Sequence, residues 1–372
     1  MKRRHALIIG FGIGGIAILA VGGILGGRQA IEQVGRVAGV TSPAPTESPA
    51  PLPTPLPSRK PEPSSPGPRT GHVMVYDPEN HGVILFGGST TLPQPDGMNL
   101  AVGLDDTWLW DGKSWTSLDV HGPSARSAAM AVYDTVRHEV VLFGGSGDGG
   151  VGPGNYLNDT WTWDGNLWHL REPVHRPDPR MRAGFTFDQA RGEVVMVGGE
   201  GAKVYISTWT WDGTDWTLRD PATNPTARRY AGMAYSPSTR TSILYGGTWA
   251  GRQLNDSWIW DGSNWRRGAA GPAAGITTLT YDSARDRVVG LVYTPAAENT
   301  SVAVIAWNGV AWSNESKKGP LLGPRVGVPL AYDAASAEVV LYGGSYIEPV
   351  PYAETWVWRG AGWFLWQSPA GA

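Results

Sequence analysis

Five arginines recur at equivalent places along the chain and carry the charge pattern best suited to binding a ligand. Each stands seven residues before an aromatic residue, and together they are Arg69, Arg126, Arg180, Arg228 and Arg325. A guanidinium group offers a planar fork of N–H donors that matches a carboxylate or a phosphate. Five such groups, if the fold brings them together around the mouth of one channel, would attract an anion. The alternative is structural, with each arginine holding loop carbonyls or a neighbouring acid, and the sequence leaves both open.

Polar and aromatic residues also gather in three long segments, Ser89–Leu104, Ser146–Leu157 and Ser345–Glu354. Loops carried on a rigid scaffold are where binding residues most often lie. Mixed aromatic and polar side chains suit a sugar or a peptide. The candidate contact residues in these segments are Asp96, Asn99, Asp148, Tyr156, Tyr346, Glu348 and Tyr352. Solvated loops without a ligand are the alternative.

Catalytic chemistry finds little support in the residue types. The chain has no cysteine, which excludes disulfides, thiolate nucleophiles and cysteine-bound metals. Its seven histidines show neither the His-x-His nor the His-Glu-x-x-His spacing of a zinc site. We therefore expect no enzyme activity, no metal and no other cofactor. The net charge of −3 argues against a nucleic-acid partner.

A glycine pattern near the N-terminus has the spacing of a dinucleotide-binding fingerprint but not its context. Gly10, Gly12 and Gly15 fit the pattern. The fingerprint needs a preceding strand and a following amphipathic helix. Here the segment after the glycines is apolar on every face and leads into a proline-rich stretch. We predict no nucleotide site.

An internal repeat sets the elements that must position the candidate residues. The aromatic residues after the arginine positions are Tyr76, Tyr133, Phe187, Tyr235, Tyr281 and Tyr332, at intervals of 46 to 57 residues. Eleven residues later a glycine pair begins in five units, at Gly87, Gly144, Gly198, Gly246 and Gly343. The fifth unit is degenerate, because Ala274 replaces the arginine and Val292-Tyr293 replaces the glycine pair. We expect it to be the weakest unit.

Tryptophans complete each unit and indicate its last two strands. Trp-x-Trp followed five residues later by Trp recurs in five units, and the fifth unit keeps Trp307 and Trp312. Asp-Gly between these strands favours a tight hairpin. Each unit is therefore interpreted as four strands. In the first unit they are expected at Gly71–Tyr76, Gly82–Phe86, Asp106–Trp110 and Ser114–Leu118.

This pattern resembles the Kelch repeat, the form also found in the propeller domain of galactose oxidase. The resemblance implies an all-β, six-bladed propeller over residues 69–372, with blades at about 69–120, 121–172, 173–220, 221–268, 269–315 and 316–368. Ring closure would make blades six, one and two neighbours, so that the three long segments form one crescent. Kelch propellers commonly complete one blade with strands from both chain ends, whereas every unit here is complete in chain order. The copper site of galactose oxidase needs a Tyr–Cys cross-link, which this chain cannot form.

The N-terminal region predicts a membrane anchor and a spacer. Lys2, Arg3 and Arg4 precede an uncharged, mostly apolar run over 6–27, which is long enough to cross a membrane as a helix. Basic residues favour the cytoplasmic side, so residues 1–5 are expected there and the propeller outside. Residues 28–68, rich in Pro, Ser and Thr, are interpreted as an extended linker. The alternative is a cleaved signal sequence and a secreted propeller.

The sequence thus predicts a membrane-anchored, extracytoplasmic and monomeric binding module. Its ligand would be an unknown protein or glycan, recognised through the loops of blades six, one and two. One alternative is a carbohydrate- or sialic-acid-active enzyme, because propellers of the Kelch class include such enzymes. Another is a structural spacer without a ligand. Fold alone does not decide among them.

Overall fold

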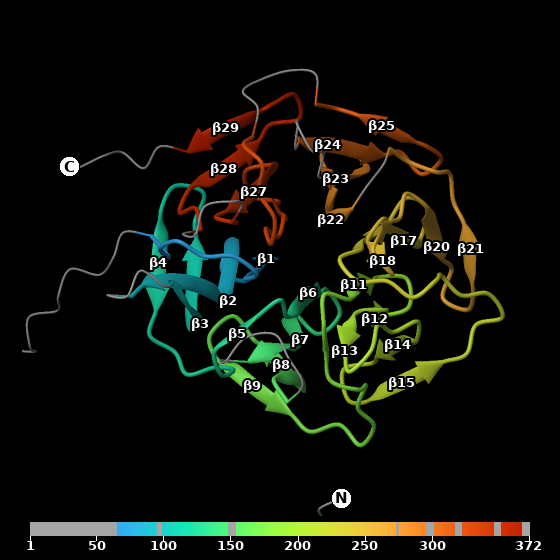
Figure 1. Cartoon of the computed structure of the whole chain (residues 1–372), viewed down its shortest axis with the longest axis horizontal. Helices are drawn as coiled ribbons and strands as arrows, with labels where there is room; N and C mark the ends of the chain where they lie inside the picture. The colour runs from blue at the N-terminus through green and yellow to red at the C-terminus, as the bar shows by residue number, and fades with distance from the viewer. Residues whose placement is uncertain are drawn as a thin grey trace, which may run out of the picture. The chain divides into compact units, whose positions relative to one another are not determined.

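The described part of the chain is a ring of six antiparallel β-sheets, the six blades of a propeller (Figure 1). This computed structural model describes residues 65–94, 99–147, 154–272, 275–294, 301–316, 322–345 and 351–366. The first strand of each blade contacts the first strands of both neighbours, which closes the ring around a central channel. The predicted all-β, six-bladed fold is therefore confirmed.

Each blade is built from four main strands in chain order, and blades two, three and four carry short additional strands. Blade one contains β1 (Val73–Asp77), β2 (Gly82–Pro93), β3 (Asn99–Trp110) and β4 (Trp115–Leu118). Blade two contains β5 (Arg126–Ser127), β6 (Met130–Asp134), β7 (Glu139–Gly147), β8 (Tyr156–Trp163) and β9 (Trp168–Arg171). Blade three contains β10 (Arg180–Met181), β11 (Gly184–Asp188), β12 (Glu193–Val197), β13 (Glu200–Gly201), β14 (Thr208–Trp211) and β15 (Trp216–Arg219).

The other three blades follow the same order. Blade four contains β16 (Gly232–Ser236), β17 (Thr241–Tyr245), β18 (Thr248–Trp249), β19 (Arg252–Gln253), β20 (Ser257–Trp260) and β21 (Trp265–Arg267). Blade five contains β22 (Ile276–Asp282), β23 (Arg287–Thr294), β24 (Ser301–Trp307) and β25 (Trp312–Asn314). Blade six contains β26 (Ala331–Asp333), β27 (Glu338–Tyr342), β28 (Thr355–Trp358) and β29 (Trp363–Trp366).

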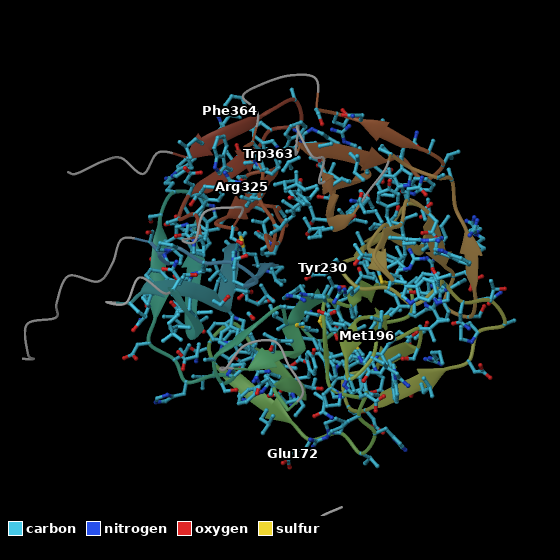
Figure 2. The ribbon with its side chains drawn as sticks, in the orientation of Figure 1. Glu172, Met196, Tyr230, Arg325, Trp363 and Phe364 are labelled. Carbon is cyan, nitrogen blue, oxygen red and sulfur yellow. The ribbon has the colours of Figure 1, made fainter. Side chains whose placement is uncertain are left out.

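The hydrophobic core lies between the blades rather than in one central layer. Six clusters of buried apolar side chains occur, one at each interface between neighbouring blades, and Figure 2 shows the side chains packed around the ring. The second strands are buried on both faces, as Val83, Ile84, Leu85 and Phe86 of β2 illustrate. Because alternate residues of a strand point to opposite faces, a continuous apolar run fills the clusters on both sides of its blade.

Tryptophan side chains also join neighbouring blades by hydrogen bonds. In blades one to four the indole nitrogen of the last tryptophan donates to a threonine hydroxyl of the preceding blade. These pairs are Trp168 with Thr107, Trp216 with Thr160, Trp265 with Thr208, and Trp115 with Thr355, at 2.9–3.1 Å. The last pair joins blade one to blade six.

Blades six and one are joined by the same kinds of contact that join the other blades. Gly344 donates its backbone N–H to the carbonyl of Arg69 at 2.8 Å, as Gly199 donates to Arg228 at 2.9 Å between blades three and four. Tyr342 of β27 donates its hydroxyl to the carbonyl of Gly67. Within the described residues no strand from one chain end enters the other end's blade. This differs from the closure that is common in Kelch propellers.

Two strands of blade one are longer than predicted. The segment expected to be a loop, Ser89–Leu104, continues the β2–β3 pairing as far as Pro93 and Asn99. The glycine pair does not end the strand: the register shifts between Phe86 and Gly88 and the pairing then resumes. A β-bulge interrupts a ladder without terminating it. The same shift occurs in blade two, where Ser146 pairs with Tyr156.

The predictions for residues 1–64 lie outside the described residues. They include the cytoplasmic stub, the membrane anchor over 6–27 and most of the linker. Residues 65–68, at the end of the predicted linker, are described, and Gly67 contacts blade six there. The part of the chain that the structure covers holds no helix with the length and apolar character needed to span a membrane.

Candidate functional site

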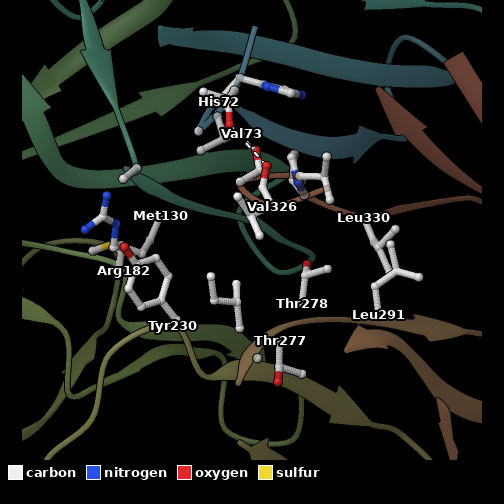
Figure 3. Close-up of a pocket in the computed structure, with 18 of the residues that line it drawn as sticks. His72, Val73, Met130, Arg182, Tyr230, Thr277, Thr278, Leu291, Val326 and Leu330 are labelled. Atoms are coloured by element: carbon white, nitrogen blue, oxygen red, sulfur yellow. Dashed lines mark hydrogen bonds between the residues drawn. The ribbon is translucent and has the colours of Figure 1, made fainter. Parts of the chain in front are cut away.

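A cavity of about 420 Å³ lies at the centre of the ring and is lined by residues from all six blades. Met130, Leu279 and Leu291, which lie within β6, β22 and β23, give it an apolar wall together with Leu330, whereas Arg182 and Tyr230 precede β11 and β16 at its rim. Figure 3 shows Met130, Arg182 and Tyr230 on one side of the cavity and Leu291 and Leu330 on the other. This rim lies where the first strands of the blades begin. Ser89 and Ser345, which follow the glycine pairs of blades one and six, also line the cavity there. A polar rim above an apolar wall suits a ligand with both kinds of surface.

A chain of backbone hydrogen bonds connects the rim from blade to blade. In each bond a backbone N–H donates to the backbone carbonyl of a residue in the neighbouring blade. The donor and acceptor residues are Gly71 and Gly327, Ala128 and Gly71, Arg182 and Ala128, Tyr230 and Arg182, and Thr277 and Tyr230. Of these residues, Ala128, Arg182 and Tyr230 hold positive φ angles of 55°, 57° and 62°. Such angles are unfavourable for residues other than glycine, and residues so constrained cluster at functional sites. Hydrogen bonds thus fix the rim from blade six through blades one to four to blade five, and the rim presents chosen side chains to the cavity.

Arg182 of blade three is the only charged residue among the rim residues joined by these backbone hydrogen bonds. Arg182 forms an ion pair with Glu200 of β13, and Arg229 of blade four binds the other oxygen of the same carboxylate. The guanidinium of Arg182 lies 4.5 Å from the ring centroid of Tyr230 (Figure 3). Burial lowers the pKa of Arg182, and the Tyr230 and Tyr156 hydroxyls oppose that shift. This cluster, Arg182 with Glu200, Arg229 and Tyr230, is a polar site on the rim that the sequence interpretation missed.

The five repeat arginines lie inside the blades rather than in the open channel. Each is at most 4% exposed. Each donates from Nη1 to the carbonyl of the first glycine of its own glycine pair, 18 residues ahead, at 3.0–3.2 Å. In four of the five blades the guanidinium also binds a carboxylate, in the pairs Arg69–Asp106, Arg126–Asp159, Arg228–Asp256 and Arg325–Glu354.

These contacts give the arginines a structural role, which was the alternative interpretation. They tie the segment before the first strand to the glycine pair and to the start of the third strand. Binding of an external anion by the set of five stays a prediction. Only Arg180 lacks a carboxylate partner within the described residues.

The crescent residues are only partly described. Asn99 starts β3 and is exposed at the end of the β2–β3 hairpin. Tyr156 starts β8 and pairs with Ser146 of β7. Tyr352 lies over the guanidinium of Arg325, 4.5 Å from CZ to the ring centroid. Asp96, Asp148, Tyr346 and Glu348 lie outside the described residues. The structure thus places Tyr156 at the start of a blade-two strand and Tyr352 beside a buried arginine.

His72 lines the cavity wall but is buried between blades one and six. Its ring lies 6.0 Å from that of Tyr342, in an edge-on arrangement. Neither ring nitrogen has a hydrogen-bond partner among the described residues. Burial, with a contribution from Arg69, holds the pKa of His72 well below its ordinary value. His72 is therefore a neutral packing residue at neutral pH. Within the described ranges no group of three acidic or histidine side chains is placed to hold a metal.

Comparison with known proteins supports the fold and goes no further. No family model and no curated protein matches the chain. Among solved structures, 190 chains match. One of them, described as the structure of YjhT, aligns with a TM-score of 0.58 and 13% sequence identity, covering 82% of this chain and 99% of that one. The likeness shows that the two chains share the six-bladed β-propeller fold, while the Kelch pattern stays a resemblance of sequence.

Proposed function

We propose that this protein is a binding module that receives a polar ligand at the rim of the central cavity. The observation that carries the proposal is the rim cluster, in which backbone hydrogen bonds hold Arg182 and Tyr230 and Glu200 pairs with Arg182 at the mouth of a cavity of about 420 Å³. A charged fork and an aromatic ring, fixed in place before binding, lower the entropy cost of recognition.

The crescent of blades six, one and two is the natural extension of this site. Ser89 and Ser345 line the cavity and begin the long segments of blades one and six. The β2–β3 hairpin presents partly exposed apolar side chains, Leu92 at 47% and Leu100 at 53%. A ligand that enters the cavity with one group and lies across the hairpins with the rest would be a glycan or a peptide segment. The proposed site thus joins a rigid pocket to an adaptable surface.

A membrane tether fits this proposal. The apolar run over 6–27 would hold the propeller on the extracytoplasmic side, where cell-surface glycans and proteins are accessible. The test is fractionation of the full-length chain and of a chain without residues 1–27. The full-length chain is expected in the membrane fraction and the shortened one in the soluble fraction. A full-length chain that is uncut and soluble would contradict the anchor.

The binding proposal is tested with the full-length protein on a broad array of cell-surface glycans. Arg182→Gln and Tyr230→Phe test the rim cluster, and Tyr133→Phe is the matched control, because Tyr133 lies at the other end of a first strand beside Glu79. We expect saturable binding that the two rim variants weaken and the control leaves unchanged. Binding that all three variants retain would place the site elsewhere. If the array shows no binding, cross-linking on intact cells tests whether the ligand is a protein instead of a glycan.

A second candidate is an enzyme that acts on a carbohydrate in the cavity. The observation that favours it is the backbone strain at Ala128, Arg182 and Tyr230, because strained residues also occur at catalytic centres. Any glycan that binds should be incubated with the protein and followed by NMR. Turnover that Arg182→Gln abolishes would establish the enzyme, and binding without turnover would support the module.

A further inference from the structure

Blade three lacks an acidic side chain that the other four arginine-containing blades possess. At the entrance to the third strand these blades carry Asp106, Asp159, Asp256 and Glu354, whereas blade three carries Ser207. The three aspartates bind their arginines through both oxygens at 2.7–2.9 Å. Ser207 instead accepts a single hydrogen bond from Nη1 of Arg180 at 3.1 Å.

The same acidic residues hold a second donor, and that donor is also left without a partner in blade three. The indole nitrogens of Trp108, Trp161, Trp258 and Trp356 donate to these carboxylates at 2.6–2.9 Å. The equivalent nitrogen of Trp209 is buried and has no hydrogen-bond partner among the described residues. A buried donor without an acceptor costs about 1–3 kcal/mol, so Trp209 favours an incoming acceptor.

A pocket of about 310 Å³ lies where the missing side chain would be. Its lining includes Arg180, Trp209, Ser207, Tyr205 and Lys203. Two exposed apolar side chains, Ile206 and Leu218, also line it. Asp178 lines it as well, so the pocket combines two cations, an indole donor and one acid with an apolar edge.

The ring of Tyr205 does not replace the missing carboxylate. It lies over the face of the Arg180 guanidinium, 3.9 Å from CZ to the ring centroid. Blade six has the same arrangement, with Tyr352 over Arg325, and there Glu354 still binds Arg325 at 3.2 Å. Stacking covers the face of a guanidinium and leaves its in-plane N–H groups free to bind an anion.

Arg180 remains a cation in this setting. Burial lowers its pKa to about 10, with Tyr205 and Asp178 acting in the opposite direction. The side chain of Asp178 is exposed, and its backbone carbonyl, not its carboxylate, accepts from Nε of Arg180. The nearby acid is thus not hydrogen-bonded to the guanidinium.

We propose that the pocket beside Arg180 and Trp209 binds the carboxylate of a small organic acid, in the place that Asp106, Asp159, Asp256 and Glu354 occupy in the other blades. One carboxylate oxygen accepts from both Nη2 of Arg180 and Nε1 of Trp209, as one oxygen of Asp106, Asp159, Asp256 and Glu354 does in the other blades. Lys203 adds positive charge, and the short apolar part of the acid contacts Ile206 and Leu218. The site is separate from the rim cluster and does not depend on the function proposed for it.

The test is an NMR titration of the full-length protein at constant ionic strength, with acetate, butyrate and phosphate as probes. The indole N–H resonance of Trp209 is identified by its loss in Trp209→Phe. We expect butyrate to shift this resonance saturably, acetate to do so more weakly, and phosphate to have little effect. A Trp209 resonance that neither carboxylate moves, or that phosphate moves with tighter binding, would overturn the proposal.

Three variants make the test specific. Ser207→Asp supplies the missing carboxylate, so it should raise the melting temperature and weaken butyrate binding by about tenfold or more. Ser207→Asn fills the same volume without the charge and should give a smaller rise. Asp178→Ser, which copies Ser124 of blade two, should strengthen butyrate binding by removing a like charge. Ser207→Asp with a lowered melting temperature or with unchanged butyrate binding would contradict the proposal.

Discussion

The backbone N–H of Gly344 and the carbonyl of Arg69 lie 2.8 Å apart, and this hydrogen bond joins the last blade to the first. Together with the bond from Trp115 to Thr355, it provides between the chain ends the contacts that join blades elsewhere in the ring. The stability of the ring therefore depends on how well each pair of neighbouring blades packs.

Gly344→Ala should destabilise the ring at the junction of blades six and one. Gly344 has a φ of +93°, and an added Cβ would overlap a methyl group of Val328. Backbone strain and overpacking together predict a loss of about 2–4 kcal/mol. The control is Gly154→Ala, because Gly154 has a φ of +94° with no atom within 4 Å of its added Cβ. Thermal and denaturant unfolding measure the stability of both variants. Equal losses of stability would show that the overlap with Val328 does not add to the cost of the backbone strain.

Thr355→Val and Val304→Thr should have opposite effects on stability. Thr355→Val removes the acceptor of the Trp115 indole and should cost about 1–3 kcal/mol. Val304 occupies the equivalent position in blade five, and the indole nitrogen of Trp363 that would face it is buried without a partner among the described residues. Val304→Thr should therefore stabilise by up to about 1 kcal/mol. The shift of the unfolding midpoint measures each effect, and a destabilising Val304→Thr would refute the equivalence.

Blade five should open before the other blades. It lacks the glycine pair, and Trp312 and Trp363 on its two sides lack indole hydrogen bonds within the described residues. Its sheet is nevertheless complete, with four paired strands. Fewer side-chain hydrogen bonds between blades predict faster local opening. Hydrogen–deuterium exchange should show the least protection in β22–β25, and protection equal to that of blade two would contradict this.

His72 should make the folded protein less stable as the pH falls. Its depressed pKa keeps it neutral in the folded state, while the unfolded chain takes up a proton below about pH 6.5. The free energy of unfolding should therefore be fully present above that pH and decrease below it, by up to about 1.4 kcal/mol per pH unit from this residue. His72→Phe loses no hydrogen bond among the described residues and should remove this contribution.

The measurement for His72 is the unfolding midpoint between pH 5 and 7 for the natural chain and for His72→Phe. The matched control is His121→Phe, because His121 is exposed. The control should keep the pH dependence of the natural chain. The same slope in His72→Phe would show that other groups account for the loss of stability.

The fold was predictable because the same residue types recur at the same positions of each repeat. Aromatic, glycine and tryptophan positions recur, and each corresponds to a strand or to a bend in the structure. The role of the arginines was also encoded, since each repeat arginine precedes its glycine by 18 residues, as in Arg69 and Gly87. A constant spacing between a donor and a bend indicates a contact within the blade rather than a group directed at solvent.

The rim cluster was not predictable in this way. The positions two residues after the repeat arginines hold Gly71, Ala128, Arg182, Tyr230 and Gly327, which share a left-handed backbone but no side-chain type. Glu200 reaches Arg182 because β13 pairs with β10, a two-residue sheet that no periodicity predicts. The strand extension in blade one was missed because the second strand was expected to end at Phe86, before the glycine pair, whereas the pair forms a bulge and the strand continues.

Because every described blade is finished in chain order, the ring has no architectural beginning. Gly67 and Trp366, near the two ends of the described propeller, contact blades six and one respectively. A circularly permuted chain, with the two ends joined by a short linker and new termini cut between any other two blades, would contain the same blades and the same interfaces. We therefore expect the propeller to fold whichever blade comes first in the chain.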